Sequence, residues 1–148
     1  MTREYLRLLD NPSLMTERIM SGTFLNMSRT VCRVLRRFGC IYGAFVVTVK
    51  LENLELIDAV STYAGSLLDQ SAVARAEIWV ADSAGLTAKT REEVLRGGDK
   101  RIEACLIVET LREGVAREIS ETVCERFGEA HMIIGCYKLL CDIQSDGN

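Results

Sequence analysis

Acidic and aromatic side chains recur at alternate positions along two short stretches in the middle of the chain. In AEIWVADS, Glu77 and Trp79 lie on the face opposite three aliphatic residues. In RIEACLIVE the corresponding mixed face is made by Glu103, Cys105, Ile107 and Glu109. Partial desolvation of a carboxylate by an indole ring raises its pKa towards neutrality, which suits it to general acid-base work. We therefore predict a proton-transfer site on this mixed face, with Glu77 and Glu103 as catalytic candidates.

His131 is the only histidine of the chain and begins the last strand-like stretch, on the same face as Tyr137. An imidazole titrates near neutral pH and is a natural general base, and in a wide pocket it also serves as an axial haem ligand. We predict His131 as the third catalytic candidate, with haem as the one cofactor to consider. A histidine at a strand end with no chemical role is the alternative.

The wall of the predicted pocket is formed by polar and aromatic residues on the same faces. The substrate-binding candidates are Trp79, Tyr137, Lys50, Glu109 and Tyr42. In the alternative interpretation, Glu77 and Glu109 lie in water at strand ends and Trp79 fills the core of a dimer. The chain has no cluster with metal-ligand spacing and no G-x-G-x-x-G turn, so we expect neither a bound metal nor a nicotinamide cofactor.

These side chains need a sheet to position them, and the hydrophobic spacing supplies its elements. Period-two alternation predicts strands within 40–50, 75–83, 101–109 and 130–143. Apolar residues at three- and four-residue spacing predict helices within 54–70 and 111–128, a short helix near 90–95, and a long helical segment from residue 13 to about 38. The arginines of that last segment, Arg29, Arg33, Arg36 and Arg37, form either a solvated helix face or a binding patch.

The order strand, helix, strand, strand, helix, strand predicts an α+β, ferredoxin-like fold. With right-handed crossovers, it gives a four-stranded antiparallel sheet that carries both helices on one face. The other face is too apolar to stay exposed, so we expect two copies to pair as a dimeric α/β barrel. The predicted organisation is an N-terminal helical extension (1–38), the sheet domain (39–143) and a tail (144–148).

The AEIWVADS stretch, followed by a polar connection with a short helix and a strand ending in Val-Glu, resembles the central part of EthD-like members of the dimeric α/β-barrel superfamily. At the level of single residues, the resemblance rests on Glu77, Trp79, Asp82 and Ser83. It implies a pocket for a hydrophobic, often aromatic or polyketide-like, small molecule. It also implies cyclase, dehydratase, isomerase, decarboxylase or cofactor-free monooxygenase chemistry.

Composition excludes several other classes of protein. A net charge of −3 leaves no basic surplus to bind a nucleic-acid backbone. No apolar run is long enough to cross a membrane, and the N-terminus lacks a signal-peptide pattern, so we expect a cytoplasmic protein. The six cysteines have no zinc-site spacing, and we predict small, buried, reduced thiols.

Two functions follow from these predictions. The first is a small cofactor-independent enzyme that acts on a hydrophobic metabolite by acid-base chemistry beneath the sheet. The second is a non-catalytic homodimer that binds a ligand or a partner, with the arginine-bearing N-terminal segment as its working surface.

Overall fold

The computed structural model describes most of the chain, namely residues 7–8, 10–23, 29–82, 91–95 (without the side chains of 92 and 93), 101–128 and 132–140. The chain divides into two compact units, 1–33 with 81–102, and 34–80 with 103–148. The domain boundaries predicted at 38/39 and 143/144 stay predictions.

Helices α2 and α4 belong to the first unit. Helix α2 spans Leu14–Gly22 and begins at Ser13, whose side-chain oxygen accepts a hydrogen bond from the backbone N–H of Thr16. The short helix α4, Arg91–Leu95, confirms the helix predicted near 90–95. Arg91 of α4 forms an ion pair with Glu17 of α2 at 2.8 Å.

The described residues of the sheet form five strands. They are β1 (Cys32–Gly39), β2 (Phe45–Leu51), β3 (Val73–Ala81), β4 (Ala104–Thr110) and β5 (Met132–Lys138), in the spatial order β1-β3-β4-β2-β5. The pairs β2–β4, β2–β5 and β3–β4 are antiparallel. Four of these strands follow the predicted order of elements, and the fold is α+β as expected.

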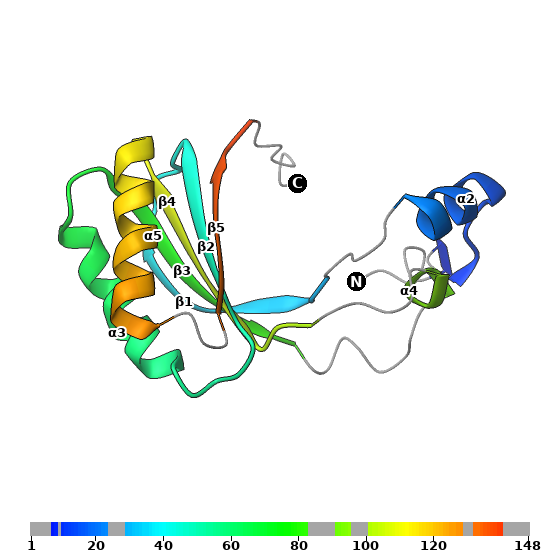
Figure 1. Ribbon diagram of the computed structural model, residues 1–148, viewed down its shortest axis with the longest axis horizontal. Helices are drawn as coiled ribbons and strands as arrows, with labels where there is room; N and C mark the ends of the chain where they lie inside the picture. Colours follow the sequence, from blue (N-terminus) through cyan, green and yellow to red (C-terminus); the bar gives the residue numbers. More distant parts are fainter. Residues whose placement is uncertain are drawn as a thin grey trace, which may run out of the picture. The chain divides into compact units, whose positions relative to one another are not determined.

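Helices α3 (Ile57–Ser66) and α5 (Glu113–Phe127) pack on the same face of the sheet (Figure 1). A single 3₁₀ turn, Leu67–Asp69, extends α3 towards β3. Helix α5 ends at Gly128, which has a positive φ of 75°, as predicted for this helix C-terminus. In the described part of the chain, no helix is long and apolar enough to cross a membrane.

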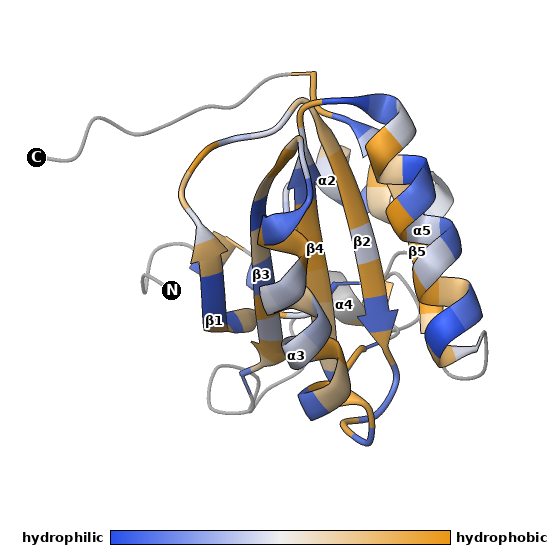
Figure 2. Cartoon of the chain, turned by 90° about the vertical axis from the view of Figure 1, so that its left-hand side faces the viewer, coloured by the Kyte–Doolittle hydropathy of each residue, from blue (hydrophilic) through white to orange (hydrophobic). Residues whose placement is uncertain are grey.

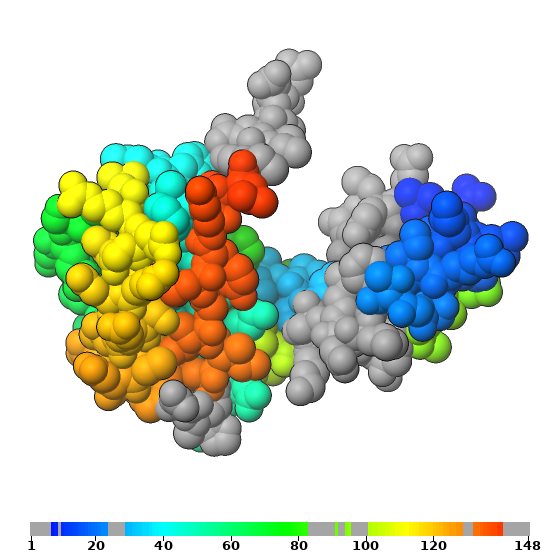
Figure 3. Space-filling view, turned by 45° about the horizontal axis from the view of Figure 1, so that its top comes forward, coloured from blue at the N-terminus to red at the C-terminus, as the bar shows by residue number. Residues whose placement is uncertain are grey.

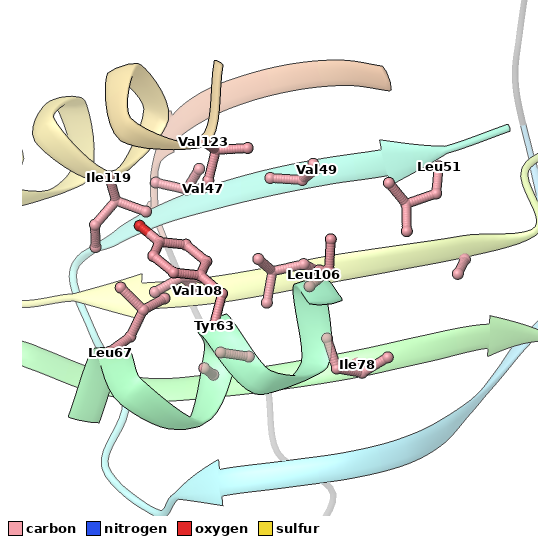
Figure 4. Close-up of a cluster of buried hydrophobic side chains, with 14 of the residues drawn as sticks. Val47, Val49, Leu51, Tyr63, Leu67, Ile78, Leu106, Val108, Ile119 and Val123 are labelled. Carbon is pink, nitrogen blue, oxygen red and sulfur yellow. The ribbon is translucent and has the colours of Figure 1, made fainter. Parts of the chain in front are cut away.

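The hydrophobic core lies between the sheet and these two helices. Its fully buried strand residues are Val47, Val49, Leu51, Ile78, Leu106 and Val108. Tyr63 and Leu67 reach them from α3 and its 3₁₀ extension, and Ile119 and Val123 reach them from α5 (Figure 4). The strands therefore use every second residue for the core, as the period-two patterns predicted.

The predicted helix from residue 13 to 38 is wrong in its last part, because residues 32–39 form strand β1. The apolar spacing in CRVLRRFG is compatible with a helix and with a strand. The free edge of β3 favours the strand. As a strand, the segment pairs with β3, places Phe38 against Gly65 of α3 and directs Arg37 to Glu77. Gly39 ends β1 with φ +76°, where an added Cβ would lie 2.5 Å from the carbonyl oxygen of Ala74.

Tyr63 lies in this core with 3% of its surface exposed, and its hydroxyl has no hydrogen-bond partner among the described residues. Burial raises the pKa of Tyr63 above its ordinary value of 10.0, against an opposing effect of the Arg126 charge. The stability linked to this pKa is present below about pH 10 and is lost as the pH rises through the folded value.

We expect Tyr63→Phe to leave the stability at pH 7 unchanged or to raise it by up to about 1 kcal/mol, since an unpaired buried hydroxyl is removed. The variant should also lose less stability than the native protein between pH 9 and 11. Urea unfolding at both pH values measures these differences, and a loss above 1 kcal/mol at pH 7 would show that the hydroxyl has a partner.

Candidate functional site

The predicted mixed face is the sheet face that α3 and α5 leave uncovered, and we call it the open face. Strand register arranges its residues in three rows across β3, β4, β2 and β5. The rows are Arg75-Glu109-Val46-Tyr137, Glu77-Ile107-Thr48-Gly135 and Trp79-Cys105-Lys50-Ile133. Of the sites predicted from the sequence, Glu77, Trp79, Glu109, Lys50 and Tyr137 thus share one face.

Glu77 lies near the centre of the β3 side of this face and is only 3% exposed. Its Oε1 accepts a hydrogen bond from Nε of Arg37 at 2.5 Å, and its Oε2 accepts one from Nε1 of Trp79 at 2.7 Å. Nη1 of Arg75 is 3.8 Å from Oε1. Both carboxylate oxygens are therefore engaged, by one strand neighbour and by an arginine from β1.

Glu109 and Arg75 form the second half of the same network. Glu109 is 6% exposed, and its two oxygens accept hydrogen bonds from the backbone N–H of Gly43, at 2.9 Å, and from Nη2 of Arg75. The ring of Tyr42 covers the Arg75 guanidinium, with 4.4 Å between Cζ and the ring centroid.

Burial by itself lowers the pKa of Arg75. The hydrogen bond and charge of Glu109, the charge of Glu77 and a hydrogen bond with Tyr42 outweigh burial and raise the pKa of Arg75 above its ordinary value. Arg75 is therefore a permanent cation, and it balances two nearly inaccessible carboxylates together with Arg37. We call Arg37, Arg75, Glu77 and Glu109 the ion network.

The ion network holds β1 and the connection after it on the sheet. Because β3 and β4 lie between β1 and β2, residues 40–44 must cross the ends of both strands to reach β2. Tyr42 and Gly43 of this connection bind Arg75 and Glu109, while Arg37 of β1 binds Glu77. An added Cβ on Gly43 would lie 2.6 Å from the backbone nitrogen and oxygen of Thr110, so the connection passes closer to β4 than any side chain allows.

Glu103 and Tyr137 do not join the ion network. Glu103 is exposed just before β4, where its backbone N–H donates to the carbonyl of Leu51 at 2.9 Å. Tyr137 is 55% exposed and its ring lies directly against Gly135. His131 lies outside the described residues, so the predicted pair of His131 with a glutamate stays a prediction.

Two polar atoms of the open face are buried without a hydrogen-bond partner among the described residues. They are Oγ1 of Thr48 and Nε of Arg75. Such atoms cost stability unless a further group or water reaches them.

Comparison with protein-family models, with the curated proteins and with the solved structures found no match for this chain. The resemblance to the EthD-like proteins therefore stays a prediction.

Sequence reasoning missed the two arginines that organise the site. Arg37 was assigned to the outer face of a helix, although it alternates with Phe38 as a strand residue does. Arg75 precedes Glu77 by two positions and so shares its face, which was the available signal. Arg-x-Glu within one strand predicts an ion pair along that strand rather than a free carboxylate.

The prediction of buried thiols is wrong for two cysteines. All five cysteines among the described residues are thiols, but Cys40 and Cys136 are exposed, while Cys105 is buried and Cys32 and Cys124 are intermediate. Cys136 lies at the edge strand β5, and Cys40 follows Gly39 in the connection to β2. Cys136 lies on the side of the sheet that α5 covers, with Sγ 3.7 Å from the carbonyl oxygen of Ala116, but at the sheet edge it stays exposed. Cys40 lies beyond the end of β1, outside the packed strand. Cys141 lies outside the described residues.

Proposed function

We propose that this protein is a homodimer in which the open faces of two copies pack together and enclose a binding site for an apolar small molecule. The observation that carries this proposal is the open face itself. It exposes 53% of Ile133 and 55% of Tyr137, and it adds the half-buried Val46, Ile107 and Trp79. A contiguous apolar surface of this kind marks an interaction site.

The topology supports the same proposal. Strands β3-β4-β2-β5 with α3 and α5 on one face have the strand order of a ferredoxin-like fold. Two such sheets that pack face to face make a dimeric α/β barrel with a cavity between them. Strand β1 and the connection at 40–44 close one side of the open face and would form part of the cavity wall.

Binding is favoured over acid-base catalysis by the ion network. Each carboxylate oxygen of Glu77 and of Glu109 already accepts a hydrogen bond from within the protein. A general base must present an oxygen to its substrate. In this arrangement the carboxylates instead fix the wall of the site.

A second candidate function is the cofactor-independent enzyme that acts on a hydrophobic metabolite. One observation favours it: the Arg37 side chain, which covers Oε1 of Glu77, is 57% exposed. If a substrate displaced Arg37, Glu77 would present a desolvated oxygen beside Trp79. Under this second function Glu77→Gln abolishes turnover without loss of ligand binding, whereas under the first there is no turnover to lose.

Trp79 is the only tryptophan of the chain, so its fluorescence reports on the open face. We expect the aromatic probe 8-anilinonaphthalene-1-sulfonate to bind saturably, with energy transfer from Trp79 to the probe. Ile107→Glu, in the middle of the open face, should weaken binding at least tenfold, because the site would then contain an unpaired buried charge.

The matched control is Leu54→Glu, at a 47% exposed leucine of the turn before α3. It should bind the probe as the native protein does. Equal binding to the Ile107→Glu and Leu54→Glu variants, or no energy transfer from Trp79, would contradict a site on the open face.

A further inference from the structure

Strand β5 is one edge of the sheet, and no described strand pairs with its outer side. It pairs with β2 in a regular antiparallel register, and the N–H of Leu139 continues this ladder to the carbonyl of Ala44 at 2.9 Å. Because bonded positions alternate in an antiparallel pair, the N–H groups of Ile133, Gly135 and Tyr137 also point to β2. Those of Ile134 and Cys136 point outward.

The two edges of the sheet differ in how they resist pairing with another strand. Strand β1 carries Arg33, Arg36 and Arg37 in eight residues, and charged edges discourage pairing. Strand β5 has no proline and no bulge in its register with β2, and its one charge is Lys138 at its end. Figure 2 shows the contrast between the hydrophilic middle of β1 and the hydrophobic inner strands. Only β5 has the character of an edge that accepts a further strand.

The sequence of β5 is compatible with a second copy of itself. Gly135 is the middle residue of Met132–Lys138, so a two-fold axis at Gly135 aligns the full strand with an antiparallel copy. Ile134 then faces the partner's Cys136 with both outward N–H groups in bonding positions. On the open face, Ile133 meets the partner's Tyr137, and on the helix-covered face Lys138 meets the partner's Met132, so no like charges oppose each other.

Helix α5 provides room for that second copy beside the edge. Figure 3 shows β5 at the surface next to α5. Two shallow grooves lie between them, one of about 320 Å³ that includes Ala116 and Cys136, and one of about 360 Å³ lined by Ser120, Cys124, Met132 and Ile134. Three small α5 residues, Ala116, Ser120 and Cys124, recur every four residues in these grooves and so lie along one side of the helix, where they leave room for a second helix. Glu113 and Arg117 also line the first groove.

We propose that β5 pairs with β5 of a second copy about Gly135, which joins two sheets into one continuous sheet with the α5 helices side by side at Ser120. This interface uses the edge of the sheet rather than its open face, so it stands apart from the proposed function. Both interfaces together make a dimer of dimers.

Ile134→Cys tests the register directly. Residues in a hydrogen-bonded antiparallel pair have Cα atoms about 5.5 Å apart, within disulfide range. We expect oxidation to give a covalent dimer through the partner's Cys136, which disappears in Ile134→Cys/Cys136→Ser. Ile133→Cys should not cross-link, because Tyr137 is its opposite residue. The proposed register would be overturned if Ile134→Cys gave no covalent dimer. It would also be overturned if Ile134→Cys/Cys136→Ser still gave one.

Sedimentation provides the second test, without a cysteine. We expect Ser120→Glu to weaken assembly through β5 at least tenfold, while Thr62→Glu, on the exposed side of α3, has no effect. Both are combined with Ile107→Glu, which removes the open-face contact. The edge interface is supported if Ile107→Glu sediments with a mass of twice 16.5 kDa and the double variant Ile107→Glu/Ser120→Glu sediments as a single chain. A single-chain mass for Ile107→Glu alone would refute it, whether or not the open faces pair in the native protein.

Discussion

Replacement of Arg75 by methionine is expected to destabilise the protein by about 3 kcal/mol or more, because it leaves the buried carboxylate of Glu109 without a counter-charge. Arg75 binds Glu109, lies 3.8 Å from Glu77, and is itself covered by Tyr42. In the variant, Glu109 keeps only the backbone N–H of Gly43. Urea unfolding at pH 7 measures the loss.

A matched control for Arg75→Met is Arg117→Met, which breaks the exposed pair with Glu113 on α5. That pair is worth no more than about 0.5 kcal/mol. Glu109→Gln added to Arg75→Met should recover at least about 1 kcal/mol, since it removes the unpaired charge. If Arg75→Met costs no more than Arg117→Met, the ion network does not hold the sheet together.

Gly43→Ala is expected to have the second large effect, about 3 kcal/mol, at the upper end of the cost of overpacking. The new methyl group would lie 2.6 Å from backbone atoms of Thr110 and 2.9 Å from the carbonyl carbon of Glu109. Backbone of a central strand cannot yield as a flexible side chain does. The connection must therefore lift off β4, which also breaks the hydrogen bond from Gly43 to Glu109.

Gly114→Ala is the control for this substitution. Gly114 lies in α5 with nothing within 4 Å of an added Cβ, so alanine should stabilise the helix by about 0.5 to 1 kcal/mol. Thermal unfolding of the two variants separates the effects. Equal melting temperatures for Gly43→Ala and the native protein would show that the connection is not packed against β4.

Much of the sheet was predictable because its strands have one purely aliphatic face. In β3 and β4 the alternation survives in the structure, and the aliphatic sets form the hydrophobic core, although Glu77, Cys105 and Glu109 of the other face are buried as well. Helix α5 was predictable for the same reason, with Ile119 and Val123 on its core side. Such patterns depend on local sequence alone.

Strand β1 was not predictable from its own residues. Val34 and Phe38 fit both helical and strand spacing, and the choice depends on the free edge of β3, which lies more than 30 residues further along the chain. The side chain of Arg37 changes role with that choice, from a solvent contact to the partner of Glu77.

The candidate site shows the same division. Alternation placed Glu77, Trp79 and Glu109 on one face, and the structure has them there. The interactions that decide their chemistry come from Arg37 and from Gly43 at long range. Sequence reasoning could therefore locate the carboxylates but not the groups that donate hydrogen bonds to them.

In the dimer that we propose, the open face pairs with a second copy. Sedimentation equilibrium of Ser120→Glu at micromolar concentration tests it most directly, because this variant leaves only the open face for assembly. We expect a mass of twice 16.5 kDa, which falls to 16.5 kDa when Ile107→Glu is added. A Ser120→Glu variant that sediments as a single chain at every concentration would contradict the claim.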